Sequence, residues 1–516
     1  MSAFDFDVLI VGSGPAGVAA AFPLLEAGLR VGMVDGAAGR ETGVSATPTD
    51  RVKESFGPDY SALLPQDDRS PKQRLYRSRH MTAAHAGRTG LVARDFRASG
   101  AIARGGLSTV WGAYAAEFDD QDLRGYPFDA AALRASYDTV ARRIGISGSH
   151  GDALDTFHGV DTPLQAAPPL HPAAALVLEN ARRAAFAQSN LGPLTLGQAR
   201  NALLTEAQGD RAACTLCKGC LWPCAGGSIY ASLHDLARLR GQPNFRLVDD
   251  FYVERIERSE EGAWAISKGG RIAARRILLA AGTLGTTRIL LESLGLYGTP
   301  VRLLSNPLLA LPLWLPRAAF QAVPGQGHTL AQLGLRMALD DGDYAAGALY
   351  SLDGLPLDFI SAKLPMSLAG AARTSAWLAG SVMVATVYFS GRFSANTLRL
   401  EEGGLRIQGG ASGDFEAACA ASSNRLRKEL RALGAWQLPG AERAPMGLDN
   451  HYAGTCPMGG SGPLATDAQG ALAALPAVHV VDGAALSGLP AKHLTFSIMA
   501  NADRIARGVG EEMRAK

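Results

Sequence analysis

The chain has 516 residues, of which 47% are hydrophobic and 19% charged, and its 50 Lys and Arg against 48 Asp and Glu give a formal net charge of +2. This length exceeds that of one domain, and the composition excludes a disordered chain and a small disulfide scaffold. The near-neutral balance provides no basic field, so we expect no nucleic-acid partner.

The N-terminus lacks the marks of a secretory signal. Residues 1–7 are short and acidic and lead directly into an apolar run, with no basic region and no cleavage site. No stretch reaches the ~18 uninterrupted apolar residues that a membrane span requires, and we expect no transmembrane segment. These features predict a cytoplasmic protein, while co-export with a partner that carries its own signal stays open.

Residues 6–35 have the pattern of a β-α-β unit. The apolar run 8–11 predicts a strand, the Ala-rich segment 15–27 a helix, and 30–34 a second strand. The intervening turn fits G-x-G-x-x-G, in which Gly12 permits the tight turn, Gly14 lets the backbone approach a pyrophosphate and Gly17 lets the helix pack on the sheet. Asp35 ends the second strand, where a carboxylate accepts hydrogen bonds from a ribose. This fingerprint does not distinguish NAD from FAD.

The elements predicted after residue 35 suggest that the end of the chain adds a strand and a helix to the first sheet. Residues 36–100 are polar with weak periodicity, and we assign no elements to them. Beyond them we expect helices at 172–200, 286–294, 413–433 and 495–508, and strands at 245–248, 252–256, 264–267, 272–279, 346–362, 380–391, 396–408 and 478–481.

The predicted fold class is therefore α/β, with a discontinuous Rossmann-like dinucleotide-binding domain and an antiparallel-sheet substrate domain with helices. We place the first part of the nucleotide domain at 1–300, including a cysteine-rich segment at 205–230. The substrate domain follows at 301–444, and the C-terminal part of the nucleotide domain at 445–516.

Four ordered motifs resemble those of the glucose-methanol-choline (GMC) flavoprotein oxidoreductases. The segment Asn450-His451-Tyr452-Ala453-Gly454-Thr455-Cys456-Pro457-Met458 resembles the H-x-x-G-T-C-x-M element of this family, and Val480-Val481-Asp482-Gly483, followed by His493 and Thr495, resembles a second element. Residues 104–112 resemble the flavin-contacting G-G-x-S loop, and residues 280–286 the second family signature. The segment 300–445 is unmatched.

The resemblance implies an FAD-binding domain and assigns roles to particular residues. FAD is expected to be noncovalent, because Val110 stands where some members attach it through a histidine. His451 is implied as the catalytic base, and His493 as its partner that holds the substrate oxygen, since a neutral imidazole can remove a hydroxyl proton as hydride leaves the same carbon. The implied cofactor contacts are Gly12, Gly14, Gly17 and Asp35 at the ADP half, Gly105, Gly106 and Ser108 near the flavin, Val253 at the adenine, Asp482 near the ribityl-pyrophosphate, and Thr495.

Four of the six cysteines fall within eleven residues. Cys214, Cys217, Cys220 and Cys224 form a C-x2-C-x2-C-x3-C run that resembles a ferredoxin-type segment, which predicts a [3Fe-4S] or [4Fe-4S] cluster. Some multi-subunit GMC dehydrogenases resemble this chain in carrying such a cluster. A structural zinc site, disulfides and buried thiols are the alternatives, of which zinc is the main one.

These observations predict an FAD-dependent dehydrogenase that oxidises an alcohol, on a sugar or glycoside, by hydride transfer to flavin N5. Electrons would leave through the iron-sulfur cluster to an electron acceptor, for which a protein partner is one candidate. Two alternatives stay open: a flavin alcohol oxidase whose four cysteines hold zinc, and a non-catalytic flavin and iron-sulfur electron-transfer subunit. The substrate and the oligomeric state are not readable from the sequence.

Overall fold

The structure is a computed structural model. It describes residues 4–37, 76–186, 194–319, 325–352, 378–440 and 442–515, together with residues 367, 370, 373 and 374.

A mainly parallel sheet forms one end of the molecule. Its order is β20-β21-β10-β1-β2-β7, in which β21, β10, β1, β2 and β7 run parallel to one another, β20 is antiparallel to β21, and the β8–β9 hairpin pairs antiparallel with β10. All of β2 and nearly all of β1 are buried, as expected of parallel strands covered on both faces. The strands are β1 (Phe6–Val11), β2 (Val31–Val34), β7 (Phe245–Val248), β8 (Arg255–Arg258), β9 (Ala263–Ser267), β10 (Gly270–Leu279), β20 (Ala471–Leu472) and β21 (Leu475–Val480).

Helices from both ends of the chain cover this sheet. Helix α1 (Pro15–Glu26) packs along α13 (Thr495–Ala515), which also contacts α5 (Ala131–Ile144). Helix α8 (Ser232–Arg240) packs on α1, and α9 (Thr283–Ser293) follows β10 directly. The N-terminal β-α-β unit is thus completed by strands and a helix from far along the chain.

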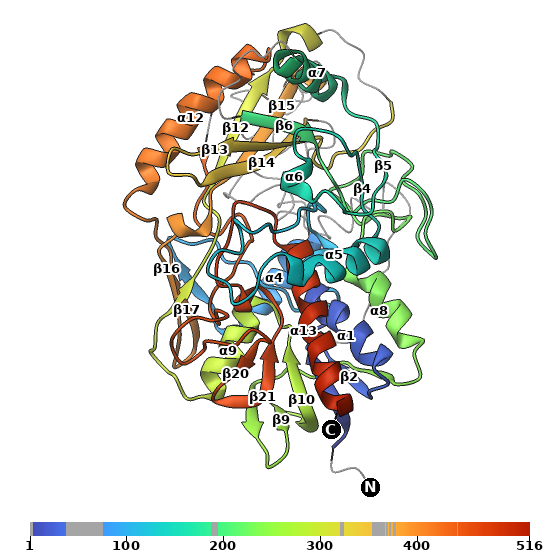
Figure 1. Ribbon diagram of the computed structural model, residues 1–516. Helices are drawn as coiled ribbons and strands as arrows, with labels where there is room; N and C mark the ends of the chain where they lie inside the picture. Colours follow the sequence, from blue (N-terminus) through green and yellow to red (C-terminus); the bar gives the residue numbers. More distant parts are fainter. Residues whose placement is uncertain are drawn as a thin grey trace.

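An antiparallel sheet forms the other end, as Figure 1 shows. Its order is β18-β12-β15-β14-β13-β6, with β19 beside β12. In Figure 1, α7 (Pro172–Phe186) and α12 (Phe415–Ala432) lie at this end. The strands are β6 (Leu194–Gln198), β12 (Leu308–Trp314), β13 (Leu333–Ala338), β14 (Tyr344–Ser351), β15 (Val382–Tyr388), β18 (Trp436–Gln437) and β19 (Glu442–Arg443).

Two expectations about elements were wrong, and a segment to which no element was assigned contains two. Residues 194–198 are strand β6 and not helix, because they pair with β13. The segment 396–408 is the hairpin β16 (Asn396–Glu401) and β17 (Gly404–Gln408), which joins β11 (Val301–Leu303) and β3 (Val92–Arg94) in a separate sheet. The polar stretch before residue 100 contains helix α4 (Tyr76–Thr89) as well as β3.

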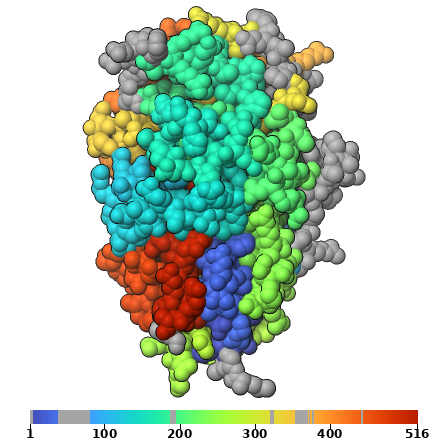
Figure 2. Space-filling view, turned by 45° about the vertical axis from the view of Figure 1, so that its right-hand side comes forward, coloured from blue at the N-terminus to red at the C-terminus, as the bar shows by residue number. Residues whose placement is uncertain are grey.

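The middle of the chain runs over the surface between the two sheets. Figure 2 shows residues coloured cyan to teal, which follow residue 100, as a band across this face, with α1 in blue and α13 in red side by side below it. Short elements in this band include β4 (Ser147–Gly148), β5 (Gln165–Ala166) and α6 (Asp155–His158). Among the described helices, none is both long and apolar enough to cross a bilayer.

Candidate functional site

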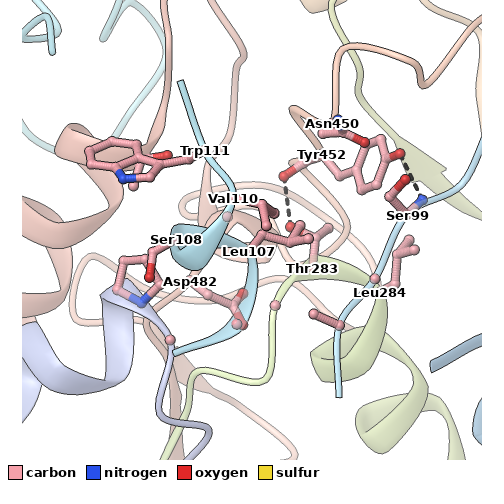
Figure 3. Close-up of a pocket in the computed structure, with 18 of the residues that line it drawn as sticks. Ser99, Leu107, Ser108, Val110, Trp111, Thr283, Leu284, Asn450, Tyr452 and Asp482 are labelled. Atoms are coloured by element: carbon pink, nitrogen blue, oxygen red, sulfur yellow. Dashed lines mark hydrogen bonds between the residues drawn. The ribbon is translucent and has the colours of Figure 1, made fainter. Parts of the chain in front are cut away.

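A cavity of about 550 Å³ runs from the glycine turn after β1 to the predicted histidine pair. Figure 3 shows part of its wall, where the Ser99 amide donates to the Tyr452 hydroxyl and the Thr283 hydroxyl donates to the Tyr452 carbonyl. Most of the residues predicted from the sequence line this cavity, namely Gly12, Gly14, Asp35, Gly106, Ser108, Val253, Asp482, Thr495, His451 and His493. Gly17 and Gly105 do not line it; a Cβ on either would collide with neighbouring protein atoms.

The glycine turn leaves the start of α1 open toward the cavity. Gly14 is the N-cap residue of the helix, and no side chain caps the free backbone N–H groups there. A Cβ on Gly14 would meet nothing within 4 Å, whereas a Cβ on Gly17 would lie 2.0 Å from the Gly12 carbonyl oxygen. Across the cavity, a Cβ on Gly106 would lie 3.7 Å from the Gly14 Cα. Two glycine loops therefore face each other around an uncapped helix N-terminus, an arrangement that fits a pyrophosphate.

Asp35 and Asp482 both stabilise loops that border the cavity. Asp35 accepts hydrogen bonds from the amide and hydroxyl of Ser13 and from the Ala37 amide, and the Ser13 hydroxyl in turn accepts from the Gly105 amide. Asp482 accepts from the Ala484 amide at 2.9 Å and from the Thr286 hydroxyl. Burial raises the pKa of Asp482 to about 6. Each carboxyl thus already orders backbone around the cavity, whatever it binds there.

The structure brings the two predicted catalytic histidines together. The ring centroids of His451 and His493 are 5.2 Å apart and the rings stand at 74°. Tyr388, near the end of β15, touches both rings at 5.1 Å, and Tyr114 stacks on His493 at 4.4 Å and 27°. Forty-two residues of sequence separate the histidines, so this contact depends on the tertiary fold.

Asn306 fixes the tautomer of His451. The Asn306 side-chain amide donates through Nδ2 to the carbonyls of Phe389 at 2.7 Å and Pro490 at 3.0 Å, which leaves Oδ1 as the acceptor facing His451 Nδ1 at 3.0 Å. Nδ1 must therefore carry the proton, and Nε2 holds the free lone pair. Burial lowers the pKa of His451 to about 4, so the imidazole is neutral at pH 7 and suited to accept a proton.

A buried carboxyl lies behind His451. Asp449 Oδ2 accepts the backbone N–H groups of Asn306 at 2.8 Å and of His451 at 3.1 Å. Burial raises the pKa of Asp449 to about 7, and burial together with the neighbouring His451 holds the pKa of His493 well below its ordinary value. Both imidazoles are therefore neutral in this site, and one carboxyl orders the backbone of His451 and of Asn306, which orients its ring.

Sequence reasoning missed several residues of this site. Asn306 and Tyr388 come from the unmatched segment 300–445, and Asn306 had only an Asn-Pro pair as its signal. His85, to which the sequence analysis assigns no role, lines the cavity from α4, together with Met81 and Thr82. These α4 residues share that wall with Tyr252 and Arg288, near Val253.

The cysteine run is a loop beside the cavity. Burial raises the pKa of Cys214 to about 11, and Cys217, Cys220 and Cys224 add electrostatically to the rise, so the four thiols lie near one another. The Leu216 amide donates to Cys214 Sγ at 3.4 Å and the Thr329 amide to Cys220 Sγ at 3.3 Å. In the part of the chain that the structure describes, however, no three His, Cys, Asp or Glu side chains are placed to hold a metal ion. The predicted metal role of these cysteines stays a prediction.

Comparison with known families identifies the part of the chain that holds both histidines. Residues 417–502 match the family model described as GMC oxidoreductase. This segment is similar to the C-terminal part of GMC oxidoreductases. The match contains His451 and His493, and it confirms the resemblance to this family for residues 417–502. A comparison with curated protein sequences gives no match.

Solved structures show a likeness of fold that extends over the whole chain. Pyridoxine 4-oxidase from Mesorbium loti is similar with a TM-score of 0.58 and 18% identity, covering 97% of this chain and 98% of that one. The R554A variant of formate oxidase from Aspergillus oryzae RIB40 is similar with a TM-score of 0.59 and 12% identity, covering 100% of both chains. At these identities the likeness establishes the fold alone, and it confirms the predicted fold class.

Proposed function

We propose that this protein is an FAD-dependent oxidoreductase that removes hydride from the CH–OH group of an alcohol. The observation that carries the proposal is the contact between His451 and His493 on the wall of a cavity that begins at an uncapped glycine turn. The GMC oxidoreductase domain at residues 417–502 supports the same conclusion.

The cavity has features that fit FAD. Gly14 and Gly106 leave backbone free of Cβ atoms where a pyrophosphate would lie, Gly12 makes the tight turn against Ala280, and Asp35 stands at the end of β2, where a ribose hydroxyl would reach it. Ser108, Asp482 and Thr495 would border the flavin end, and Val253 the adenine end. We infer that residues 1–300 and 445–516 hold FAD and that residues 301–444 form most of the substrate wall.

The two histidines would divide the proton and charge chemistry between them. When bound, the isoalloxazine supplies a hydride acceptor at N5. His451 would take the hydroxyl proton at Nε2, because Nδ1–H is held by Asn306 and the ring is neutral. His493 would hold the substrate oxygen from the other side, where its neutral ring can donate a hydrogen bond to the developing charge. Tyr388 packs against both rings and would help to hold them in place.

We infer an uncharged substrate, with a sugar or glycoside as the proposed class. The described wall contributed by the antiparallel sheet and its connections is aliphatic, aromatic or hydroxyl-bearing and carries no charged side chain; its members are Leu308, Thr329, Leu330, Tyr350, Ser351, Thr386 and Tyr388. Aromatic faces pack on the C–H faces of a sugar ring, and an anionic substrate would find no cation there.

We propose further that the electrons leave through an iron-sulfur cluster at Cys214, Cys217, Cys220 and Cys224 to an external acceptor. The spacing and mutual proximity of the thiols support this assignment, as does the position of the loop, since Leu221 and Thr329 line the cavity and adjoin Cys220. Because the described thiols are not placed as a ready ligand set, the assignment depends on metal analysis.

A second candidate is a flavin oxidase that passes electrons to oxygen. It is favoured by the names of the two similar structures, pyridoxine 4-oxidase and formate oxidase. Comparing the rate of reoxidation by oxygen with the rate by an artificial dye, on protein purified without air, distinguishes an oxidase from a dehydrogenase.

The test of the proposed function is anaerobic reduction of the bound flavin by a panel of neutral sugars, glycosides and simple alcohols. His451→Gln should retain FAD but lose flavin reduction by about 10²- to 10⁴-fold, the usual contribution of a general base. His479→Gln is the matched control, because His479 is also buried but lies on β21 and does not line the cavity. A parent protein whose flavin no alcohol bleaches would be the non-catalytic electron-transfer subunit.

A further inference from the structure

The loop that carries His493 contains a completely buried lysine. The Lys492 side chain is 0% exposed, and its ammonium lies 2.7 Å from Asp122 Oδ2 and 3.2 Å from Asp119 Oδ2. It also donates to the Glu117 carbonyl at 2.8 Å. Lysines are almost never fully buried unless they are paired, and an ion pair inside a protein recovers little more than its desolvation cost. Stability alone is therefore a weak reason for this pair to stand next to a predicted catalytic residue.

The pair extends from the histidine loop to the substrate sheet. The Tyr344 hydroxyl donates to Asp122 Oδ1, and Tyr344 is the first residue of β14. At the other end of the same strand, Tyr350 and Ser351 line the cavity. The contacts thus run from β14 through Asp122 to Lys492, one residue from His493.

The ring of His493 is held less firmly than the ring of His451. The His451 ring is held by a hydrogen bond to Asn306, whereas no hydrogen bond from a described side chain or backbone group reaches the His493 ring. Ring packing is what the structure shows for it, chiefly the stack with Tyr114, whose hydroxyl is held by His158 Nε2 at 2.7 Å. The direction of the His493 side chain therefore depends on how firmly its backbone is held, and Lys492 is the adjacent residue that anchors it.

We propose that Lys492 is a positioning residue for His493. Its ammonium fastens the histidine loop to residues 117–122, and Asp122 ties that anchor to β14, so that the placement of His493 is coupled to the substrate wall. This inference rests on the proposed function, in which His493 holds the substrate oxygen.

The test uses the FAD-loaded full chain and a variant in which both charges are removed together, Lys492→Met with Asp122→Asn. Removing the ammonium together with the Asp122 carboxylate avoids a fully buried unpaired charge, because the other partner, Asp119, is 45% exposed, and the asparagine can still accept from Tyr344. We expect the rate of anaerobic flavin reduction to fall about tenfold or more, while FAD content stays the same and the substrate dissociation constant changes less than twofold. A misplaced catalytic group produces this split between rate and binding.

A control and a double-mutant cycle separate positioning from a general loss of structure. The control, Arg507→Met with Asp503→Asn, removes another ion pair, which lies on α13. Its Arg507 Nε and Asp503 Oδ2 are 2.7 Å apart, and the Asp503 side chain is fully buried. This control should leave the reduction rate unchanged. In a His493→Ala background, the Lys492 and Asp122 changes should cost less than twofold, because an effect that acts through His493 disappears with it.

The outcomes are distinguishable. If the double variant reduces its flavin as fast as the parent, or if its effect persists in full without His493, the positioning role is refuted. If no alcohol reduces the flavin of the parent, the proposed function fails first, and this inference fails with it. If the double variant does not retain FAD, Tyr344→Phe, which removes one hydroxyl, must still slow reduction by twofold or more for the coupling to stand.

Discussion

The clearest test of the cofactor assignment compares two glycines of the same turn. Gly14→Ala adds a methyl group that meets no protein atom within 4 Å, at a φ of −68° that alanine adopts freely. Alanine is a poorer N-cap than glycine by about 0.5–1 kcal/mol, and its stiffer unfolded chain returns about 0.4–1 kcal/mol, so the two terms nearly cancel. We expect the FAD-free protein to melt at the parent temperature.

Gly17→Ala should behave in the opposite way. Its methyl group would lie 2.0 Å from the Gly12 carbonyl oxygen and 3.3 Å from an Ile10 methyl, and the first of these is backbone that cannot rotate away. Overpacking of this kind costs about 1–3 kcal/mol, which exceeds the gain in helix propensity of up to about 1 kcal/mol. The FAD-free melting temperature should therefore fall, because α1 is pushed away from the turn.

FAD titration of the two variants completes the comparison. The Gly14 methyl group occupies the space that a pyrophosphate would need, so FAD affinity should weaken at least tenfold, or about 1.4 kcal/mol, without loss of stability. Melting followed by circular dichroism and binding followed by quenching of flavin fluorescence give both quantities. If Gly14→Ala binds FAD within twofold of the parent, the dinucleotide does not lie over this turn, and the reasoning fails.

Three further results are expected. Burial raises the pKa of Asp449 from 3.8 to about 7, so the folded state keeps a proton that the unfolded state releases, and stability falls by about 3 kcal/mol as the pH rises from 4 to 7; urea unfolding at several pH values should show a flatter profile for Asp449→Asn. Flavin reduction should stay constant from pH 8 to about 5 and decline only near pH 4, where His451 takes up a proton; a decline near 6.5 would contradict its burial. Protein purified without air should contain iron and acid-labile sulfide, which Cys220→Ser should lower and Cys419→Ser should not; zinc in their place would favour the alternative site.

The nucleotide end of the fold could be predicted because the residues that determine it are close together in the sequence. The strand, turn and helix of residues 6–26 follow from an apolar run and three spaced glycines. A parallel strand that is buried on both faces has an unbroken run of apolar residues, which is easily recognised in the sequence. Residues 194–198 and 396–408 were misplaced because their pairing partners are distant: β6 joins β13, and β17 joins β3. The β-propensity of a segment depends on its own residues, whereas the strand with which it pairs is decided by tertiary packing.

The candidate site divides in the same way. His451 and His493 stand in readable motifs, so their meeting was predicted and is found. Asn306 could not be predicted, because its role arises from two carbonyls, at residues 389 and 490, that orient its amide. Lys492 lies next to a predicted residue, yet its burial follows from Asp122, which is 370 residues earlier in the chain.

The central claim is that His451 and His493 face one side of a flavin held by the glycine turn. A crystal structure of the protein loaded with FAD tests it most directly. The account predicts flavin N5 beside the space between His451 Nε2 and the His493 ring, within about 3–3.5 Å of a bound alcohol carbon. A flavin ring bound away from both imidazoles, or with N5 turned from them, would contradict it.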